Sequence, residues 1–287
     1  MLRKNTTLLT VSYNSLNVIK IFLNQKRLDS FKEIIVIDNR SLDGTINYIK
    51  ENFPSVLCIE NDKNYGYGKA VNIGLNYVKT NYVLITNPDT IFSNSFFLDL
   101  ENAAKRYPIF SILSPSFFNY KEIKNFNGIS FSSNQILSKP NSDYKATIPG
   151  PCFLANLNFF NDKKIWDDQI FLYFEDHDLV RRLKDKKIPI ITLFDCHIFN
   201  IEGGSTPNSF DLLRLKNWHY GWSFMYFKRK YNEKNIYVFI LTILKRLLVS
   251  IFLMKKNKFY TSYFRLKGCI AFKQGIKSMD IRDLGPF

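Results

Sequence analysis

The sequence predicts an α/β protein with a mostly parallel, doubly wound sheet. In the first third of the chain, short apolar runs typical of buried strands alternate with stretches that suit helices. A polar cluster follows several of these runs directly, as happens where the strands of such a sheet end at a ligand site. Hydrophobic residues make up 46% of the 287 residues, which is enough for a sizeable core.

Four apolar runs predict the first strands of the sheet. They occupy residues 8–13, 33–37, 56–60 and 82–86. The stretches between them predict helices at about 16–25, 45–52 and 69–78. Farther along, the pattern predicts a helix at 178–186 and a strand at 188–193. Residues 114–143 are rich in Ser and Asn and predict loops with short strands.

The positive charge lies almost entirely in the C-terminal quarter of the chain. Residues 1–213 carry 24 Lys and Arg against 22 Asp and Glu, a net charge of +2. Residues 214–287 carry 16 against 3, a net charge of +13. This difference predicts a folded domain at 1–213 and a basic, apolar helical segment at 214–287. Such a segment indicates an anionic partner, either membrane lipid or nucleic acid.

Residues 236–254 form an apolar stretch that is interrupted by Lys245 and Arg246. The stretch is long enough to span a bilayer, but each charge at its centre would cost roughly 2.5–3.5 kcal/mol to insert. The two charges fall on one helical stripe with Thr242 and Ser250, which predicts an amphipathic helix lying in the membrane interface. A core helix of a small C-terminal domain is the alternative.

The four cysteines, Cys58, Cys152, Cys196 and Cys269, are scattered and form no CxxC pair. We therefore expect free thiols in a reducing compartment. The first apolar run is too short for a secretory signal, so we expect none.

Asn87-Pro88-Asp89 follows the strand predicted at 82–86. A carboxylate at the end of a buried strand is well placed to hold a divalent cation, since hard cations such as Mg²⁺ take oxygen ligands beside a phosphate. Asn-Pro and Asp also favour turns, so a simple turn is the alternative. Asp89 is the candidate metal ligand in this motif.

Three carboxylates stand close together in Glu175-Asp176-His177-Asp178, after an aromatic run. Crowded carboxylates repel one another, so one of them can have the raised pKa that suits a general base. The same residues would also stabilise a helix N-terminus, where acids complement the dipole and Asp178 can pair with Arg182. Both interpretations can hold, because one acid can cap the helix while another carries chemistry.

Two further features are weaker signals by themselves. His197 follows the predicted strand and precedes Gly203-Gly204-Ser205-Thr206, and a neutral imidazole there can complete a metal site. A structural histidine is the alternative. The glycines within residues 64–69, before a predicted helix, allow backbone N–H groups to approach a diphosphate.

Taken in order, these stretches resemble the inverting family 2 glycosyltransferases of the GT-A fold, and most closely their bacterial rhamnosyltransferase-like members. The resemblance covers about residues 8–230. Six motifs carry it: Thr10-Val11-Ser12-Tyr13-Asn14; Val36-Ile37-Asp38-Asn39 with Ser41, Asp43, Gly44 and Thr45; Asn64-Tyr65-Gly66-Tyr67-Gly68 with Asn72 and Gly74; Asn87-Pro88-Asp89; Gly150-Pro151-Cys152-Phe153-Leu154; and Tyr173-Phe174-Glu175-Asp176-His177-Asp178-Leu179. Six motifs in the family's order are far more specific than any one of them.

The resemblance implies a role for each motif. Asp176 is expected to be the general base that deprotonates the acceptor hydroxyl, with Glu175 and Asp178 shaping the acceptor side. Asp89 is expected to bind Mg²⁺ or Mn²⁺, with His197 as a second ligand. The residues expected to bind the nucleotide sugar are Thr10, Ser12, Tyr13, Asn14, Asp38, Asn39, Arg40, Asn64, Gly66, Tyr67, Gly68, Asn72 and Asn87.

The implied activity is the metal-dependent, inverting transfer of a hexose from a nucleotide sugar to a glycan acceptor. The expected donor is dTDP-rhamnose, and the alternative is a donor of galactofuranose or an N-acetylhexosamine, such as a UDP-sugar. The expected acceptor is a glycan on a lipid diphosphate, in the synthesis of a bacterial surface polysaccharide such as O-antigen.

The implied location is peripheral, at the cytoplasmic face of the inner membrane, with the basic segment on an anionic membrane surface. A protein ending near residue 230 is then expected to remain soluble and to bind donor, but not membrane. Soluble nucleotide sugar would reach the enzyme from the cytoplasm.

Two other classes of function compete with this interpretation. The charge of segment 214–287 would suit a nucleic-acid-binding protein, but its basic residues alternate with long apolar runs, so we expect no nucleic acid partner. The other is a nucleotide-sugar-binding module without catalysis, which the intact Glu175-Asp176 pair disfavours.

Overall fold

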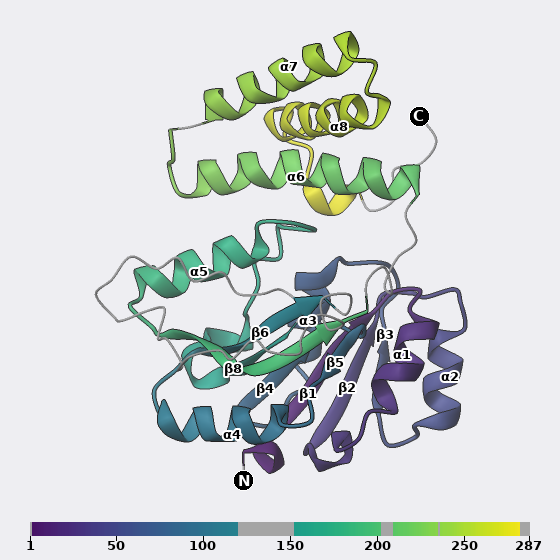
Figure 1. The fold of residues 1–287 in the computed structure, drawn as a ribbon, viewed down its shortest axis with the longest axis vertical. Helices are drawn as coiled ribbons and strands as arrows, with labels where there is room; N and C mark the ends of the chain where they lie inside the picture. The colour runs from purple at the N-terminus through teal and green to yellow at the C-terminus, as the bar shows by residue number, and fades with distance from the viewer. Residues whose placement is uncertain (1, 120–151, 202–208, 235, 282–287) are drawn as a thin grey trace, which may run out of the picture. The chain divides into compact units, whose positions relative to one another are not determined.

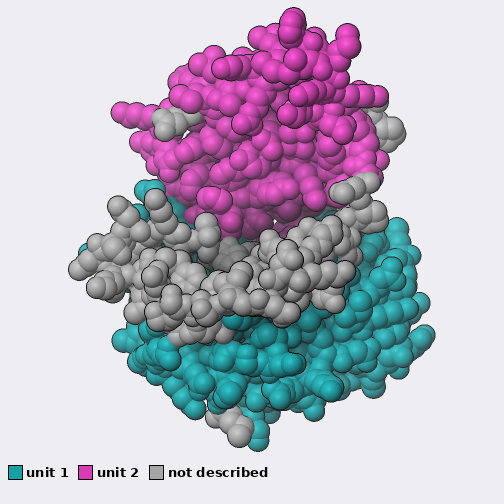
Figure 2. All heavy atoms as spheres, viewed as in Figure 1, with its two compact units in different colours: residues 1–64, 70–166, 179–207 teal, residues 65–69, 167–178, 208–287 magenta. Residues whose placement is uncertain are grey.

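The computed structural model describes residues 2–119, 152–201, 209–234 and 236–281. The chain forms two compact units, each assembled from separate stretches (Figures 1 and 2). Unit 1 comprises residues 1–64, 70–166 and 179–207, and unit 2 comprises 65–69, 167–178 and 208–287. The boundary expected between residues 213 and 214 falls inside helix α6 (Phe210–Lys230).

Unit 1 is built on an eight-stranded mixed sheet (Figure 1). Its strands are β1 (Thr6–Ser12), β2 (Glu33–Asp38), β3 (Leu57–Glu60), β4 (Tyr82–Thr86), β5 (Thr90–Phe92), β6 (Ile112–Asn119), β7 (Cys152–Asn156) and β8 (Ile190–Asn200). Their order across the sheet is β3-β2-β1-β4-β7-β6-β8-β5. Strands β1 to β4 are parallel, β7 is antiparallel to β4 and β6, and β5 is antiparallel to β8. The α/β class is confirmed, with a parallel first half and a mixed second half.

Helices connect the parallel strands, as the sequence predicts. The helices of this part are α1 (Leu16–Leu23), α2 (Thr45–Asn52), α3 (Tyr67–Leu75), α4 (Phe96–Arg106) and α5 (Glu175–Asp185). Four single turns of 3₁₀ helix accompany them: Arg3–Asn5, Leu28–Ser30, Leu157–Phe159 and Asn161–Lys163. Gly44, at φ +84°, precedes α2, where a left-handed backbone conformation suits glycine.

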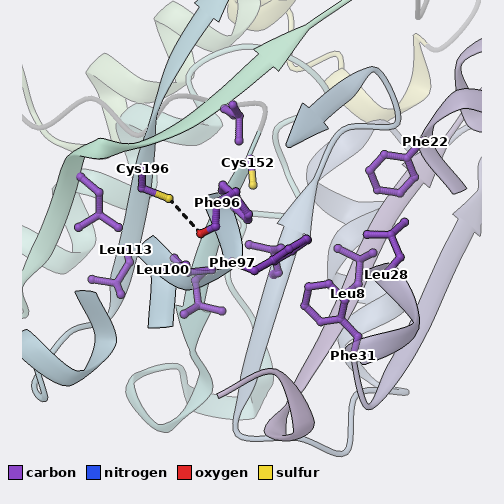
Figure 3. Packing of buried hydrophobic residues seen from close by; sticks show 14 of the residues in the cluster. Leu8, Phe22, Leu28, Phe31, Phe96, Phe97, Leu100, Leu113, Cys152 and Cys196 are labelled. Carbon is purple, nitrogen blue, oxygen red and sulfur yellow. Dashed lines mark hydrogen bonds between the residues drawn. The ribbon is translucent and has the colours of Figure 1, made fainter. Parts of the chain in front are cut away.

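The core of unit 1 packs on the central strands (Figure 3). Leu8, Val36 and Leu84, from β1, β2 and β4, are fully buried. Phe22 from α1 and Phe96 from α4 join the same cluster. A strand that is buried on both faces consists almost entirely of apolar residues, so it can be predicted from an unbroken apolar run in the sequence. The polar residues that follow each run therefore lie at strand ends.

Strand β8 is longer than the sequence predicts. Its first part corresponds to the strand expected at 188–193, but pairing resumes after a shift in register: Pro115 pairs with Leu193, and Ser116 pairs with His197. The residues between Leu193 and His197 form a bulge, which breaks the alternation that marks a strand in a sequence. His197, expected to follow the strand, therefore lies within it. Strand β6 begins at Ile112 and covers the start of the stretch expected to contain loops with short strands, and residues 120–143 lie outside the described part of the chain.

The four cysteines are free thiols, as predicted. Burial raises the pKa of Cys58 to about 11, and the pKa of Cys152 and of Cys269 to about 12. The Cys196 thiol lies 3.6 Å from the carbonyl oxygen of Phe96 (Figure 3). Since the thiolate is the reactive form, these raised pKa values make the thiols poor nucleophiles.

Unit 2 is mainly helical, with α6, α7 (Ile236–Phe252), α8 (Lys256–Lys273) and a 3₁₀ turn at Ser278–Asp280. Helix α8 packs against both α6 and α7. The backbones of α6 and α8 approach closely at two glycines, because a Cβ on Gly221 would lie 2.0 Å from the carbonyl oxygen of Arg265, and one on Gly268 would lie 2.0 Å from that of Trp218. The C-terminal helical segment expected from the sequence is present.

Helix α7 corresponds to the apolar stretch at 236–254. Ile243 is buried with Met225 and Cys269, and Phe239 and Leu247 are partly buried against this cluster. Within the described part of the chain, no helix is both long enough and apolar enough to cross a membrane.

Candidate functional site

Asp38 is the centre of a buried polar cluster at the ends of β1 and β2. Ser12 and Asp38 are the last residues of these strands and pair directly in the parallel ladder. The Asp38 carboxylate is fully buried and accepts hydrogen bonds from Ser12 Oγ, Ser41 N and Ser41 Oγ, each at 2.6 Å. Three short hydrogen bonds to one carboxylate fix its position. The structure thus brings together Ser12 and Asp38, and it adds Ser41, which the sequence singled out only as part of a motif.

The loop after β2 is tied to the loop after β1. Asn14 Oδ1 accepts a hydrogen bond from Leu42 N–H at 2.8 Å. Asp43 accepts one from Leu16 N–H at 2.9 Å and another from Thr45 Oγ1 at 2.5 Å. Burial raises the pKa of Asp43, but the hydrogen bonds from Thr45 and Leu16 more than offset this, so the pKa lies below its usual value. The ionised Asp43 therefore holds both loops in one arrangement.

Asn39 and Arg40 extend this cluster. Asn39 is buried, and its Oδ1 accepts a hydrogen bond from Asn61 Nδ2 at 2.8 Å. Arg40 is exposed, with φ +65°, and its guanidinium donates to the carbonyl oxygen of Asp62 at 2.8 Å. A positive φ is uncommon for a residue with a side chain and marks a strained position. Arg40 thereby presents a cation two residues after Asp38.

Asp89 lies in the turn between β4 and β5 and is only 4% exposed. The turn is closed by a hydrogen bond from Thr90 N–H to the carbonyl oxygen of Asn87, at 3.2 Å. Strand β4 is parallel to β1, with Thr86 paired to Thr10. Asp89 therefore follows a strand that ends at the same edge of the sheet as Ser12, where ligands bind in sheets of this type.

His197 does not lie beside Asp89. In the antiparallel pair of β5 and β8, Ile201 N–H donates to the carbonyl oxygen of Asp89 at 3.0 Å, and Ser93 N–H donates to that of His197 at 3.3 Å. The two candidate ligands are therefore four positions apart along the ladder, which corresponds to roughly 13 Å. This is a separation between backbones, and the role of His197 as a second metal ligand stays a prediction.

The carboxylate of Asp89 suits a divalent metal ion that binds together with the phosphates of its substrate. Among the described residues, no group of three or more His, Cys, Asp or Glu side chains is arranged to hold a metal ion. Magnesium is commonly bound through one or two carboxylates together with substrate phosphates and water. A buried carboxylate at the end of β4 fits that mode of binding.

Residues 65–69 belong to unit 2 and lead into α3, which begins at Tyr67. Gly66 has φ +75°, and a Cβ at this position would lie 2.5 Å from the carbonyl oxygen of Phe171. Both features require glycine. From the sequence, these glycines indicate the approach of a diphosphate, and the structure gives Gly66 a packing reason as well. The Lys69 ammonium lies 4.7 Å from the ring centroid of Tyr65.

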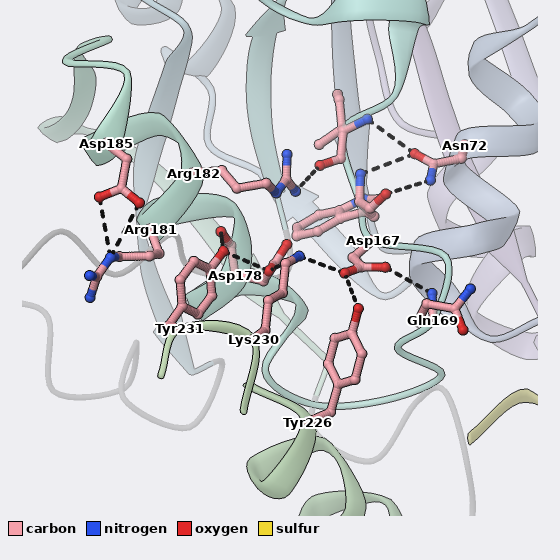
Figure 4. A network of polar contacts seen from close by, with 12 residues as sticks. Asn72, Asp167, Gln169, Asp178, Arg181, Arg182, Asp185, Tyr226, Lys230 and Tyr231 are labelled. Carbon is pink, nitrogen blue, oxygen red and sulfur yellow. Dashed lines mark hydrogen bonds and ion pairs between the residues drawn. The ribbon is translucent and has the colours of Figure 1, made fainter. Parts of the chain in front are cut away.

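Asn72 holds two backbone segments of unit 1 together (Figure 4). Its Nδ2 donates to the carbonyl oxygen of Trp166 at 2.8 Å, and its Oδ1 accepts from the N–H groups of Ile165 and Trp166, each at 3.1 Å. Both ends of the amide are thus engaged by backbone. The predicted contact of Asn72 with a nucleotide sugar stays a prediction.

Tyr173 and Phe174 form a strained turn directly before α5, with φ values of +66° and +68°. Left-handed backbone at a residue with a side chain costs on the order of 1–3 kcal/mol and is concentrated at functional sites. The Phe174 ring packs against Tyr220, Phe224 and Phe227 of α6, at centroid distances of 5.3, 5.8 and 5.7 Å. Helix α6 thereby supports the turn that presents the first residues of α5.

The first two carboxylates of α5 have opposite pKa shifts. Burial, with a contribution from the charge of Asp176, raises the pKa of Glu175 to about 7. Its buried Oε2 has no hydrogen-bond partner among the described residues. Burial also raises the pKa of Asp176, but His177 more than offsets this through Nδ1 at 2.9 Å and its N–H at 2.8 Å, so the pKa is lowered. Asp176 is therefore ionised at neutral pH, and it raises the pKa of His177 in turn.

Asp178 is fully buried and belongs to a network that links α5 to α6 (Figure 4). It accepts hydrogen bonds from Lys230 Nζ at 2.5 Å and from the Tyr231 hydroxyl at 2.8 Å. Lys230 also contacts Asp167 at 2.6 Å, and the Tyr226 hydroxyl donates to Asp167 at 2.8 Å. Burial raises the pKa of Asp167, but hydrogen bonds, led by that from Lys230, lower it below its usual value. These contacts give Asp178 a supporting role, and its predicted place at the acceptor side stays a prediction.

The model of glycosyl transferase family 2 matches residues 7–189, which is more than half of the chain. The chain belongs to this family. The match includes the Asp38 cluster, Asp89 and the start of α5.

Among curated relatives of this glycosyltransferase is the N-acetylglucosaminyl-diphospho-decaprenol L-rhamnosyltransferase of Mycobacterium tuberculosis, found in two strains. It is 24% identical over 185 residues, which are 52% of this chain and 60% of the mycobacterial enzyme. The chain thus spans less than two thirds of the length of this relative.

Solved glycosyltransferase structures share the fold. The mannosyltransferase PcManGT of Pyrobaculum calidifontis, in complex with GDP-Man and Mn²⁺, has a TM-score of 0.57 and 13% identity, over 94% of this chain and 87% of that one. Residues 1–349 of S. aureus TarS with UDP-GlcNAc have a TM-score of 0.53 and 15% identity, over 94% and 92% of the two chains. The fold of this family 2 enzyme is GT-A, as the resemblance of the sequence implies.

The other residues expected to bind the nucleotide sugar of this glycosyltransferase lie near strand ends or at the start of α3. Thr10 is buried in β1, and its Oγ1 has no hydrogen-bond partner in the described part of the chain. Tyr13 N–H donates to Ser15 Oγ at 3.1 Å. Asn64, Tyr67 and Asn87 are half-buried, and Gly68 is buried. Gly150, Pro151 and the stretch Gly203–Thr206 lie outside the described residues.

Proposed function

We propose that this family 2 glycosyltransferase transfers L-rhamnose from dTDP-rhamnose, with inversion, to a glycan carried on a lipid diphosphate. The observation that carries this proposal is the likeness over 185 residues to an enzyme whose name specifies L-rhamnose transfer and a diphospho-decaprenol acceptor. The product would belong to a bacterial surface polysaccharide such as O-antigen.

The nucleoside of the donor is proposed to lie against the Asp38 cluster. The carboxylate of Asp38 is held by Ser12 and Ser41, so it can meet hydroxyl or N–H donors of a nucleoside without reorganising. Arg40 is exposed two residues later, and its guanidinium suits the diphosphate that follows the nucleoside.

Asp89 is proposed to hold Mg²⁺ or Mn²⁺ together with the donor diphosphate. A divalent ion in that position supplies charge neutralisation for the departing nucleoside diphosphate. Asp89 fits this task because it is a buried carboxylate at the end of β4, the edge at which Asp38 also lies. The mannosyltransferase with the same fold was solved with Mn²⁺ and GDP-Man.

Asp176 is proposed to be the general base. Its lowered pKa keeps it ionised at neutral pH, and His177 fixes its carboxylate. The proton of the acceptor hydroxyl passes to Asp176 while the acceptor oxygen bonds to the anomeric carbon, and the nucleoside diphosphate leaves from the opposite face. This single displacement inverts the anomeric centre. Glu175 is proposed to line the acceptor side.

The enzyme is proposed to work peripherally at the cytoplasmic face of the inner membrane. Support comes from the net charge of +13 over residues 214–287 and from the exposed apolar side chains of α7. An acceptor anchored by a lipid has to be reached at the membrane surface. A nucleic acid partner is not proposed, because it offers nothing to cover the apolar side chains.

A donor screen tests this proposal. The purified enzyme is given a lipid-diphosphate-linked glycan and, in turn, dTDP-rhamnose, UDP-galactofuranose, UDP-N-acetylglucosamine or GDP-mannose, and release of nucleoside diphosphate is measured. We expect release that depends on the acceptor with dTDP-rhamnose. Release only with another donor would contradict rhamnose transfer and leave the family assignment intact.

The same assay tests the metal site. Asp89→Asn is expected to keep the fold and to lose nearly all transfer, as is the wild-type enzyme in excess EDTA, with recovery on adding Mn²⁺ or Mg²⁺. Asp29→Asn, at an exposed aspartate in a 3₁₀ turn, is the matched control and should remain active. Full activity of Asp89→Asn, or of the enzyme in EDTA, would refute the metal assignment.

A further inference from the structure

Helices α7 and α8 form a hairpin with a strong excess of positive charge. Residues 236–273 contain eight basic side chains and no acidic one. The basic residues are Lys245, Arg246, Lys255, Lys256, Lys258, Arg265, Lys267 and Lys273. No described carboxylate forms an ion pair with Lys245, Arg246, Lys255 or Lys258. The charge of the hairpin is therefore available to a partner.

A cavity of about 650 Å³ lies within this hairpin. Four cations line it: Lys245, Arg246, Lys255 and Lys258. Four hydroxyl groups line it as well, from Thr242, Ser250, Thr261 and Ser262. Three of these hydroxyls donate to helix carbonyl groups, so the ammonium and guanidinium groups are the main donors that face a ligand. Such a set of donors suits the oxygen atoms of a phosphate.

Helix α7 carries three stripes of different character. One stripe packs in the core of unit 2 through Ile236, Phe239, Ile243 and Leu247. A second stripe is apolar and exposed, with Tyr237 at 76%, Leu241 at 65%, Leu248 at 69% and Phe252 at 87%. The third stripe contains Thr242, Lys245, Arg246 and Val249 and lines the cavity. At about 100° per residue, the three stripes occupy successive sectors of the helix, so the exposed apolar stripe adjoins the cationic one.

The turn between α7 and α8 continues the exposed apolar surface. Met254 is 92% exposed, and Leu253 is 49% exposed and also lines the cavity. Exposed apolar surface of this extent, beside unpaired cations, marks a surface that a partner covers.

The positive charge of the hairpin, together with its exposed apolar stripe, distinguishes between possible partners. A second copy of the chain, joined through the same surface, would bring eight basic side chains against eight others with no acidic residue between them. A nucleic acid would neutralise the charge but leave the apolar stripe in water. A bilayer that contains anionic lipid satisfies both stripes, because acyl chains cover the apolar one and phosphates meet the cations.

We propose that the α7–α8 hairpin lies in the membrane interface, with its apolar stripe among the acyl chains and its cavity around the phosphate of an anionic phospholipid. This inference rests on the proposed membrane location of the enzyme. It adds the binding element and the lipid group that the element recognises. Lys245, Arg246, Lys255 and Lys258 are the residues that contact the phosphate.

Flotation of the full-length protein with vesicles tests the cavity. The protein is mixed with vesicles of phosphatidylcholine alone or with phosphatidylglycerol added, and the bound fraction gives a partition coefficient. A basic residue near an anionic surface contributes about fivefold to partition. Lys255→Gln with Lys258→Gln is expected to lower partition into the anionic vesicles about tenfold or more.

The matched control removes the same charge from elsewhere in the same hairpin. Lys267 and Lys273 are exposed on α8 and do not line the cavity. Lys267→Gln with Lys273→Gln is expected to lower partition about threefold or less. An equal loss in the two double variants would mean that only overall charge matters and would overturn the phosphate site.

A second pair of variants tests the apolar stripe. Leu241→Ser with Leu248→Ser is expected to lower partition into both kinds of vesicle about tenfold. Leu42→Ser with Leu98→Ser, at residues 87% and 59% exposed in unit 1, is the control and should change partition little. Unchanged partition of the α7 variant would overturn insertion of this stripe.

Two further measurements test whether the phosphate belongs to a phospholipid, to free phosphate or to a polyprenyl diphosphate. Calorimetry with inorganic phosphate and no vesicles is expected to show no more binding than chloride at the same ionic strength. Neutral vesicles that carry a polyprenyl diphosphate are expected to recruit less protein than phosphatidylglycerol vesicles. Tight binding of free phosphate, or recruitment by the diphosphate lipid alone, would overturn the assignment to an anionic phospholipid.

These measurements need no transfer activity. An inactive enzyme that still prefers anionic vesicles would contradict the proposed reaction and leave this inference standing. An active enzyme that does not prefer anionic vesicles would contradict this inference and leave the proposed reaction standing.

Discussion

The two carboxylates that begin α5 differ in charge near neutral pH, and this difference separates their roles. Asp176 is ionised and held by His177, whereas the pKa of Glu175 is about 7. Asp176→Asn should lower kcat by about 10²–10⁴, the usual contribution of a positioned base, with donor affinity unchanged. Glu175→Gln, which is the matched variant one residue away, should keep kcat within about tenfold. Turnover measured at saturating donor checks both.

The pH profile provides a second readout for the same pair. If Asp176 accepts the proton, kcat/KM should stay level as pH falls through 7, because the pKa of Asp176 lies below its usual value of 3.8. If Glu175 accepts it, the rate should fall about tenfold per pH unit below about 7. An acid limb near pH 7 in the wild-type enzyme, together with a loss of kcat of about 10²-fold or more in Glu175→Gln, would show that Glu175 is the base.

His219 is a buried histidine that the sequence did not single out. Its Nε2 lies 2.7 Å from the carbonyl oxygen of Ile281, which can only accept, so Nε2 carries the proton. Its Nδ1 lies 3.0 Å from Ser278 Oγ, and Phe171 N–H donates to the same oxygen at 3.4 Å. Burial lowers the pKa of His219 to about 4. The neutral ring therefore joins α6 to the 3₁₀ turn at Ser278–Asp280.

This histidine should make stability depend on pH. Between pH 4 and 6.5 the unfolded chain binds a proton at His219 that the folded protein does not, so stability is present above about 6.5 and is lost as pH falls towards 4. The slope is up to about 1.4 kcal/mol per pH unit. His219→Gln should be less stable at pH 7 and show a shallower slope in this window, measured by urea unfolding.

His177→Gln is the control for that experiment. The pKa of His177 is raised, so its contribution is present below 6.5 and is lost as pH rises, which is the opposite direction. A wild-type slope that survives unchanged in His219→Gln would contradict the assignment.

At the scale of helices and strands, the sequence predicts most of what is local. Buried parallel strands appear as apolar runs, and the polar residues after β1, β2 and β4 identify the edge where Asp38 and Asp89 lie. The sequence predicts too short a strand here because the bulge of β8 interrupts the alternation after Leu193. The sequence therefore places His197 after the strand, whereas the structure places it within the strand.

Contacts between distant parts of the chain could not be predicted from one sequence. Asn72 stands within a family motif, yet its amide is occupied by backbone 93 and 94 residues away. Asp178 stands within an acidic motif, yet Lys230 pairs with it from 52 residues away. Residue type and local spacing carry no information about such partners, so the sequence does not predict these contacts.

The crossing of α6 and α8 depends on two glycines. Alanine at Gly221 or Gly268 would place a Cβ 2.0 Å from a backbone carbonyl oxygen, so one helix must move. Overpacking of this kind costs about 1–3 kcal/mol or more, against a gain of about 1 kcal/mol from the better helix propensity of alanine. Gly221→Ala and Gly268→Ala should each lower Tm. Lys267→Ala, exposed on α8, should not, and an unchanged Tm in both glycine variants would refute the close crossing.

For the whole molecule, the structure changes the expectation for a shortened protein. The sequence predicts that a protein ending near residue 230 stays soluble, but α8 buries Trp218 and Trp222 of α6, and α7 and α8 bury Met225. Ending the chain at Lys230 should expose these side chains and cause aggregation, measured by light scattering. Ending it after Ile281, which keeps the carbonyl that His219 uses, is the control. A monodisperse, folded protein ending at Lys230 would contradict this prediction.

The way unit 2 is assembled also bears on how the protein is made. Ribosomes synthesise the chain from its N-terminus, and the last described strand of the sheet ends at Asn200, before α6, α7 and α8 exist. Asp167 cannot form its hydrogen bond with Lys230 until 63 more residues have been synthesised, and Phe171 cannot form its hydrogen bond with Ser278 until 107 more have been. Domains generally fold as they emerge, so a nascent chain can complete the edge around Asp38 while Asp176 still lies on an unfinished unit. Translation of α6, α7 and α8 thus completes the surroundings of the proposed base.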